Sequence, residues 1–126
     1  MSYTEEYHLN STNQACKDIY VKLKTQMLEY KSDLKFNSTK YYVSIVSKRS
    51  SVYILFRQKK LTIIIMLPLS VLKQNIKHHA IIPVGEGRQR YFGGQCATVI
   101  IKDTSNLDEI INVLKLAINK QSSRIG

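Results

Sequence analysis

Basic residues and tyrosines are interleaved between residues 40 and 60, and this combination suits contact with a polyanion. Aromatic rings stack on nucleic-acid bases while neighbouring cations neutralise phosphates, so together they can form a platform for single strands. An alternative interpretation is that tyrosine and lysine occupy the half-exposed face of a sheet, where amphipathic side chains are common. The candidate contacts in this stretch are Lys40, Tyr42, Arg57, Lys59 and Lys60, with Tyr53 on the same predicted face.

A glycine-bearing segment, Gly85–Gly94, supplies the second candidate site. Glycines permit close backbone approach, and the guanidinium forks of arginine suit phosphate. The segment lacks the Gly-Lys-Ser/Thr of a Walker motif, and no helix is expected after it, as a dinucleotide-binding turn would require. We expect this loop to contact anions; the alternative is a connecting loop that its arginines keep soluble. The candidate contacts are Arg88, Arg90 and Tyr91.

The positive charge of the chain is concentrated in its middle. Residues 35–102 contain twelve Lys or Arg and a single acid, Glu86, which gives a net charge of +11. Residues 1–34 carry four Lys and five acids, residues 103–126 carry as many acids as bases, and the whole chain has a net charge of +10. A field this strong over one part of a small domain attracts polyanions and speeds their encounter. The charge therefore predicts a partner and says nothing about a reaction.

Residue types that catalyse reactions or hold metals are sparse and unfavourably spaced. His78 and His79 are adjacent, so on a strand they face opposite sides, and the cysteines show no ligand spacing. Nucleases hold metals with clustered carboxylates, whereas Glu86 is the only acid in residues 34–102. We therefore expect no catalytic residue, no metal site and no cofactor. An enzyme would need a carboxylate cluster assembled in space from Glu5, Glu6, Glu86 and Asp103.

Length and composition predict one domain that covers residues 1–126. The chain is long enough to bury a core, and its 44% hydrophobic and 22% charged content is typical of globular proteins. Its polar, acidic start does not resemble a signal peptide, and the longest apolar stretch, residues 61–72, is shorter than the ~20 residues that span a bilayer. Cys16 and Cys96 are expected to be reduced thiols. We predict a soluble cytoplasmic protein whose ends, residues 1–10 and 121–126, are poorly ordered.

Hydrophobic periodicity predicts the elements that position the candidate residues. Ser11 and Gln14 have the spacing of a capping box, and an apolar stripe from Ala15 to Tyr30 predicts a helix that ends near Ser32. From Thr39 the period changes to two, which is typical of strands. The predicted strands cover residues 40–48, 52–57 and 60–67, with tight turns at 48–51 and 58–59, and they predict an antiparallel meander.

The second half of the chain predicts shorter elements and a final helix. They are a helical turn or loop at residues 69–77, an edge strand at 80–84, a further strand at 96–102 and an amphipathic helix from 107 to 118. Ser105 and Asp108 have capping-box spacing before that helix. The predicted fold class is α+β: an antiparallel β-sheet, formed by a β-meander plus one or two further strands, flanked by an N-terminal and a C-terminal helix on one face.

The opposite face of this predicted sheet is too apolar for a surface in contact with water. We expect the 69–77 segment or a helix to cover it; the alternative is that it meets another chain. The residues assigned to this face are Val46, Leu55, Ile64, Met66 and Ile100.

Five short motifs spread over residues 3–120 carry a family resemblance. They are Tyr3-Thr4-Glu5-Glu6-Tyr7-His8-Leu9, Thr39-Lys40-Tyr41-Tyr42, Gln58-Lys59-Lys60-Leu61, Phe92-Gly93 and Ser105-Asn106-Leu107-Asp108. With these motifs the chain resembles an uncharacterised prokaryotic family, domain of unknown function 5655, whose older label is "predicted transport protein". The family pattern has Asp where Tyr7 stands and Trp where Phe92 stands, followed by an acid where this chain has Gln95-Cys96.

The resemblance implies an accessory domain, because members of such families also occur at the ends of larger proteins with restriction or nuclease modules. It thereby implies a nucleic-acid context beside a defence-type nuclease. Together with the charge, it makes the leading prediction a non-catalytic basic module that binds DNA, RNA or another polyanion. The alternative is a protein-interaction module, a homodimer or an adaptor, that presents the apolar sheet face and its basic rim to an acidic protein surface. Neither function involves a membrane.

Overall fold

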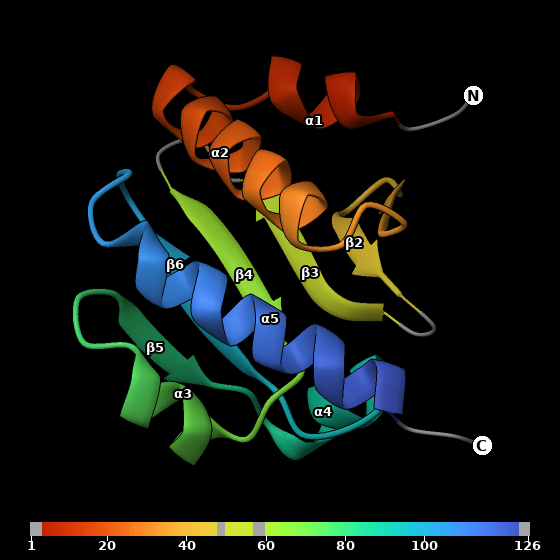
Figure 1. The fold of residues 1–126 in the computed structure, drawn as a ribbon, viewed down its shortest axis with the longest axis vertical. Coiled ribbons are helices and arrows are strands. Elements are labelled where there is room, and N and C mark those ends of the chain that lie inside the picture. Colours follow the sequence, from red (N-terminus) through yellow and green to blue (C-terminus); the bar gives the residue numbers. More distant parts are fainter. Residues whose placement is uncertain (1–3, 48–49, 57–59, 124–126) are drawn as a thin grey trace.

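The fold is α+β, with a six-stranded antiparallel sheet and helices from both ends of the chain packed on one of its faces (Figure 1). The computed structural model describes residues 4–47, 50–56 and 60–123. The elements, in chain order, are α1 (Glu5–Asn10), α2 (Gln14–Tyr30), β1 (Lys35–Ser38), β2 (Val43–Val46), β3 (Ser50–Phe56), β4 (Leu61–Ile65), α3 (Leu69–Asn75), β5 (Ala80–Pro83), α4 (Glu86–Phe92), β6 (Ala97–Ile101) and α5 (Leu107–Ser123).

The strands lie in the order β1-β2-β3-β4-β6-β5, and every neighbouring pair is antiparallel. Strands β1 to β4 form a continuous meander, which confirms the predicted one and adds β1 at its start. Strand β6 is inserted between β4 and β5, so the predicted edge strand, β5, does lie at an edge. The sheet therefore contains both of the further strands that the sequence predicted.

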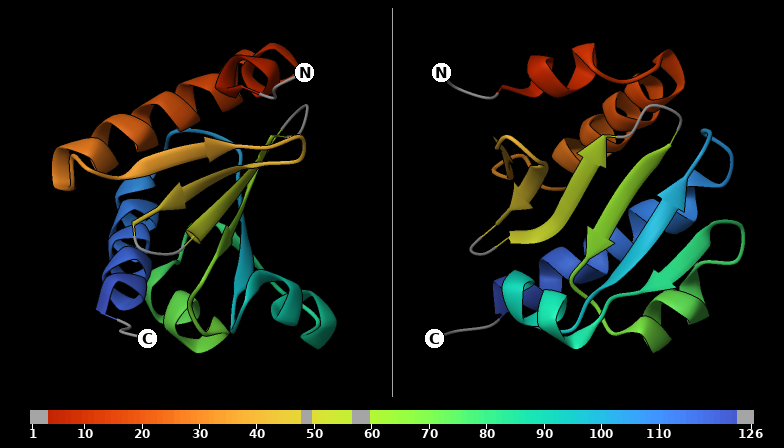
Figure 2. Two further views of the ribbon diagram at one scale, coloured as in Figure 1. Left: turned by 90° about the vertical axis from the view of Figure 1, so that its right-hand side faces the viewer. Right: turned by 180° about the vertical axis from the view of Figure 1, so that it is seen from behind.

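Strand β4 is apolar on both faces and sets the layers of the molecule. Leu61, Ile63 and Ile65 point into the main core, whereas Ile64 belongs to a smaller cluster on the other side of the sheet. The main core lies beneath α2 and α5, which cover the same face of the sheet (Figure 2). The helices contribute Ile19, Tyr20, Leu23 and Met27 from α2 and Ile110, Val113, Leu114, Ala117 and Ile118 from α5.

Helix α2 begins at a different cap from the predicted one. The side chain of Asn13 accepts a hydrogen bond from the Cys16 amide at 2.9 Å, while Ser11 Oγ donates to the His8 carbonyl at 3.0 Å at the end of the preceding helix. Ser11 therefore belongs to the end of α1 and Asn13 to the start of α2. The predicted stripe is buried at its centre, but Ala15 is exposed because Cys16 and Tyr20 take the buried positions.

Residues 5–10, which we expected to be poorly ordered, form helix α1. Glu5 fixes this helix to α2: its carboxylate accepts a hydrogen bond from Tyr20 Oη at 2.6 Å and from Lys24 Nζ at 2.7 and 2.8 Å. His8 is buried, its Nε2 lies 2.6 Å from the Thr39 carbonyl oxygen, and its ring stacks on Phe56. These contacts join residues far apart in sequence, which is why local periodicity did not predict the helix.

Replacement of Ile63 tests the role of β4 as the central strand. Ile63→Ala removes a fully buried side chain from the main core, and we expect it to lower the free energy of unfolding by about 2–5 kcal/mol. Ile82→Ala is the matched control, because Ile82 lies on edge strand β5 and is 46% exposed; we expect a change of about 0.5 kcal/mol or less. Chemical denaturation measures both, and equal losses would contradict this layer assignment.

Candidate functional site

Part of the candidate set lies around the sheet face opposite α2 and α5, which we call the second face. Two rows of cross-strand neighbours define it: Ser44, Tyr53, Ile64, Thr98 and Ile82, and beside them Leu55, Thr62, Ile100 and Ala80. From behind, the sheet lies in front of α5, and α4 lies at one end of the strands (Figure 2). This is the apolar face that the sequence placed opposite the helices.

Helix α4 covers one end of the second face. It brings Phe92 against the cluster of buried residues formed by Tyr53, Ile64, Met66, Val84 and Cys96. The covering helix thus comes from the glycine-bearing segment, whereas α3, from the 69–77 segment, contacts α5 and β5. Ile64 and Met66 are buried in this way, while Val46, Leu55 and Ile100 stay half-buried.

The prediction of a loop over Gly85–Gly94 is wrong, because Glu86–Phe92 is helical. Gly93 ends α4 in the left-handed region (φ 96°), and the amides of Gly93 and Gly94 both donate to the Gln89 carbonyl. A left-handed glycine that closes a helix in this way is a common C-terminal cap. The sequence contains the signals for it: Glu86 in the first turn, Arg90 in the last and the Gly93-Gly94 pair directly after.

Four aromatic rings from three segments form a continuous cluster on the second face. The Tyr53 ring lies 5.0 Å from that of Tyr42 and 4.7 Å from that of Phe92, and the Phe92 ring lies 5.1 Å from that of Tyr91. Tyr53 is buried at the centre, Tyr42 is half-buried, and Tyr91 is 74% exposed. We call these four residues the aromatic cluster; it ends in a ring that solvent, or a base, can reach.

Burial raises the pKa of ionisable side chains in this region. Burial raises the pKa of Tyr42, and the nearby hydroxyls of Tyr91 and Tyr53 raise it further. Burial also raises the pKa of the Cys96 thiol, an effect that the charge of Arg88 only partly offsets. A protonated thiol is a poor nucleophile. The region therefore offers ring faces, hydroxyl groups and arginine cations for binding.

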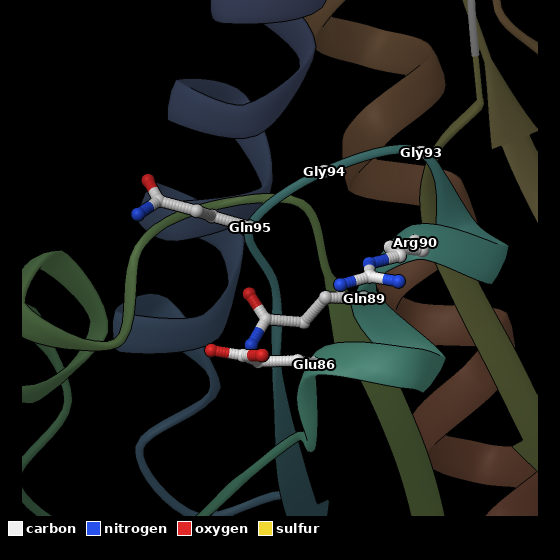
Figure 3. A pocket seen from close by; sticks show the side chains of 6 residues that line it. All are labelled: Glu86, Gln89, Arg90, Gly93, Gly94 and Gln95. Carbon is white, nitrogen blue, oxygen red and sulfur yellow. The ribbon is translucent and has the colours of Figure 1, made fainter.

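An open hollow of about 730 Å³ lies beside α4 (Figure 3). It is bordered by polar side chains and glycine backbone: Glu86, Gln89 and Arg90 from α4, and Gly93, Gly94 and Gln95 from the segment that leads to β6. Gln89 Nε2 donates to the Val84 carbonyl at 2.8 Å, which fixes that amide at the edge of the hollow. Arg90 thus faces a different region from Arg88, whose charge acts on Cys96.

The remaining predicted contacts lie at the other end of the strands. Lys40 is at the tip of the β1–β2 hairpin, where Thr39 Oγ1 accepts hydrogen bonds from the Tyr41 and Tyr42 amides and Lys40 Nζ lies 5.6 Å from the Tyr41 ring centroid. Lys60 is exposed directly before β4. Arg57 and Lys59 lie outside the described residues. The predicted set is therefore divided: Tyr42 and Tyr91 belong to the aromatic cluster, Arg88 and Arg90 lie on α4, and Lys40 and Lys60 lie at the other end of the strands.

Two aromatic residues that were not among the predicted contacts lie next to them. Phe92 anchors α4, and Tyr41 is 69% exposed at the hairpin tip beside Lys40. The adjacent aromatics Tyr91-Phe92 before Gly93 were a usable signal for the first, because one ring of such a pair can be buried while the other is exposed. Tyr41 shares the alternation of the buried Val43 and Ile45, so the pattern alone would group it with them. It is exposed because it lies in the turn before β2.

The carboxylates that an enzyme would need are not gathered. Glu5 binds Tyr20 and Lys24 on the helical side of the sheet, Glu86 borders the hollow at α4, and Asp103 accepts a hydrogen bond from the Ser105 amide. Cys16 lies in the main core and Cys96 in the cluster on the second face, so the sheet separates the two thiols. Within the described ranges, no three His, Cys, Asp or Glu side chains are placed to share a metal ion.

Replacement of Phe92 tests whether this ring holds α4 on the sheet. In the wild type the Cys96 thiol is 4% exposed. In Phe92→Ala we expect it to be alkylated roughly tenfold faster, because a loss of about 1.4 kcal/mol in local stability makes the exposed state tenfold more populated. Cys16 is the internal control, because it lies in the main core with no exposed surface. Mass spectrometry of the labelled peptides measures both rates. An unchanged Cys96 rate would show that other contacts hold α4.

Glu109 gives the fold a predictable dependence on acid. Burial acts to raise its pKa, but hydrogen bonds from the Lys77 and His78 amides and from the His78 ring outweigh it and leave the pKa lowered. A carboxyl with a lowered folded-state pKa adds stability above its unfolded pKa of about 4.3 and loses it as pH falls through the folded value. We expect Glu109→Gln to be less stable than the wild type at pH 5.5, with the gap closing near pH 3 in denaturation curves. A gap that persists at pH 3 would contradict this.

Comparison with protein-family models, with curated proteins and with solved structures found no match for the chain. The resemblance to domain of unknown function 5655 stays a prediction. None of the described helices has the length and apolar character needed to cross a membrane.

Proposed function

We propose that this chain is a non-catalytic module that binds single-stranded nucleic acid across its second face. The observation that carries the proposal is the aromatic cluster, which leads from the buried Tyr53 to the 74% exposed Tyr91 and has basic residues on either side. Stacking on aromatic rings beside cations is the general mode by which proteins hold single strands without strong sequence preference. Binding of this kind needs no reacting group.

The positions of the cations suit a strand that follows the β-strands. Arg88 and Arg90 lie on α4 at one end, and Lys40 and Lys60 lie at the other. From Lys60 to Met66 is six residues, or ~20 Å at the rise of a β-strand. A strand along this path would stack a base on Tyr91, pass the half-buried Tyr42, and have phosphates near cations at both ends.

The distribution of charge along the chain also supports binding of a polyanion at the second face. Glu5 and Glu109, the two acids in the ion pairs of the described residues, are bound to Lys24 and His78 respectively. The acids of α1, α2 and α5 belong to the helical layer, whereas the +11 charge of residues 35–102 belongs to the sheet and its connections. The segments that form α1, α2 and α5 are nearly neutral, so the field that attracts a polyanion comes from residues 35–102. The family resemblance, with its nucleic-acid context, agrees with this proposal.

Titration of labelled oligonucleotides by fluorescence anisotropy tests the proposal. For a single strand we expect micromolar or tighter binding at low salt, with log affinity falling linearly against log salt by about 0.7 for each phosphate contacted. Tyr91→Ala should weaken binding by at least about fivefold through lost stacking. Arg88→Gln and Arg90→Gln should each lower the salt slope by about 0.7.

Lys22→Gln is the matched control for charge, because Lys22 is exposed on α2, in the helical layer. We expect this variant to bind like the wild type. Absence of binding to any oligonucleotide at low salt would overturn the proposal. Binding that Lys22→Gln weakens as much as Arg88→Gln would show that the charge of the chain acts without a defined surface.

A second candidate, a protein-interaction module, is favoured by one observation. Ile82 is 46% exposed on edge strand β5, beside the half-buried Ile100 of the second face. An exposed apolar edge can pair with a second copy of the chain or with an acidic partner. The same titration separates the two functions, because a protein-interaction module would show no stacking contribution from Tyr91.

A further inference from the structure

We infer that a pocket at the end of the second face remote from α4 binds the terminal phosphate of a nucleic-acid strand. The inference rests on the proposed function and adds the class of strand that the surface prefers. The pocket has a volume of about 360 Å³. Its lining consists of His78, His79, Ala80, Ile100, Lys102, Asp103, Ser105 and Asn106.

Lys102 lines this pocket, and the exposed Lys60 directly precedes β4, the strand that pairs with β6. Leu61 pairs with Ile101 at the end of the ladder between β4 and β6, and the same register continued by one residue would bring Lys60 opposite Lys102. Leu61 and Ile101 point into the main core, and the alternation of strand side chains, continued by one residue, would direct both lysines to the second face. Like charges directly opposite on neighbouring strands are destabilising. An anion held between the two ammonium groups would remove that repulsion.

The wall of the pocket is formed by groups that are already held in place. Asp103 Oδ1 accepts a hydrogen bond from the Ser105 amide at 2.9 Å, and Asn106 has a positive φ of 56°. His79 Nε2 donates to the Asn106 carbonyl at 3.1 Å, and His78 is bound to Glu109. A rigid wall lowers the cost of ordering a ligand.

A terminal phosphate suits this position better than an internal one. A phosphate monoester carries a charge of about −1.5 to −2 at neutral pH and three acceptor oxygens, whereas an internal diester carries a single negative charge. Lys60, Lys102 and the Ser105 hydroxyl are donors that can share these oxygens. The carboxylate of Asp103 lines the same pocket and repels an anion. Removing its charge should therefore strengthen phosphate binding, whereas removing the charge of Lys102 should weaken it.

The experiment compares one oligonucleotide in three forms, with free hydroxyl ends, with a 5′-phosphate and with a 3′-phosphate, by fluorescence anisotropy. We expect one phosphorylated form to bind about tenfold more tightly than the hydroxyl form, as one charge-assisted hydrogen bond would give. In Lys102→Gln this ratio should fall to about one. In Asp103→Asn, which keeps an acceptor for the Ser105 amide, the ratio should rise roughly threefold. Lys22→Gln is the control and should keep the wild-type ratio.

The outcomes separate this inference from the proposed function. If all three forms bind equally, the phosphate pocket is wrong and the nucleic-acid proposal stands. If the preference survives in Lys102→Gln, the phosphate is recognised elsewhere and this pocket is again wrong. If no oligonucleotide binds, the proposed function fails, and inorganic phosphate becomes the probe. Shifts of amide resonances confined to residues 100–106 would then support an anion pocket, and their absence would overturn it.

Discussion

The two-sided apolar character of β4 is the constraint on which the rest of the structure depends. With Leu61, Ile63 and Ile65 on one face and Ile64 on the other, neither face of the central sheet can be left in water over its whole length. Helices α2 and α5 cover the first face and shield it from water. Among the described residues, the second face is covered by a helix at one end, where the short helix α4 packs Phe92 against it. The rest of the second face is therefore left partly exposed and available for binding.

The same constraint explains why binding groups meet on the second face. A long helix over this face would have buried Tyr42 and Tyr91 completely, whereas a seven-residue helix leaves the latter exposed. The segments that form α1, α2 and α5 carry nearly equal numbers of acids and bases, whereas residues 35–102, which form the strands and their connections, carry a net charge of +11. The sheet separates the layer formed by α2 and α5 from the second face (Figure 2).

Sequence periodicity was sufficient to predict the meander, helices α2 and α5, and the fold class, because each of these elements shows an alternating or helical apolar pattern within its own sequence. It did not find β1, whose sequence Lys35–Ser38 contains a single large apolar residue, or α1, which depends on Glu5 reaching Tyr20 and Lys24. For α4 the glycines were interpreted as a loop, although Gly85 is the N-cap and Gly93 the C-cap of this helix. The grouping of Tyr42 with Tyr91 depends on α4 packing across the sheet, a long-range contact that no local pattern contains.

The insertion of β6 between β4 and β5 has a consequence for how the chain reaches this fold. Strand β5 is made before β6 but hydrogen-bonds only to it, so it cannot join the sheet until residues 97–101 have paired with β4. Until then β4, with the sequence Leu-Thr-Ile-Ile-Ile, is an open edge. Such a strand is a template for pairing between chains. During synthesis, or in a fragment that stops short of residue 97, the strand that organises the native molecule is also the one most exposed to aggregation.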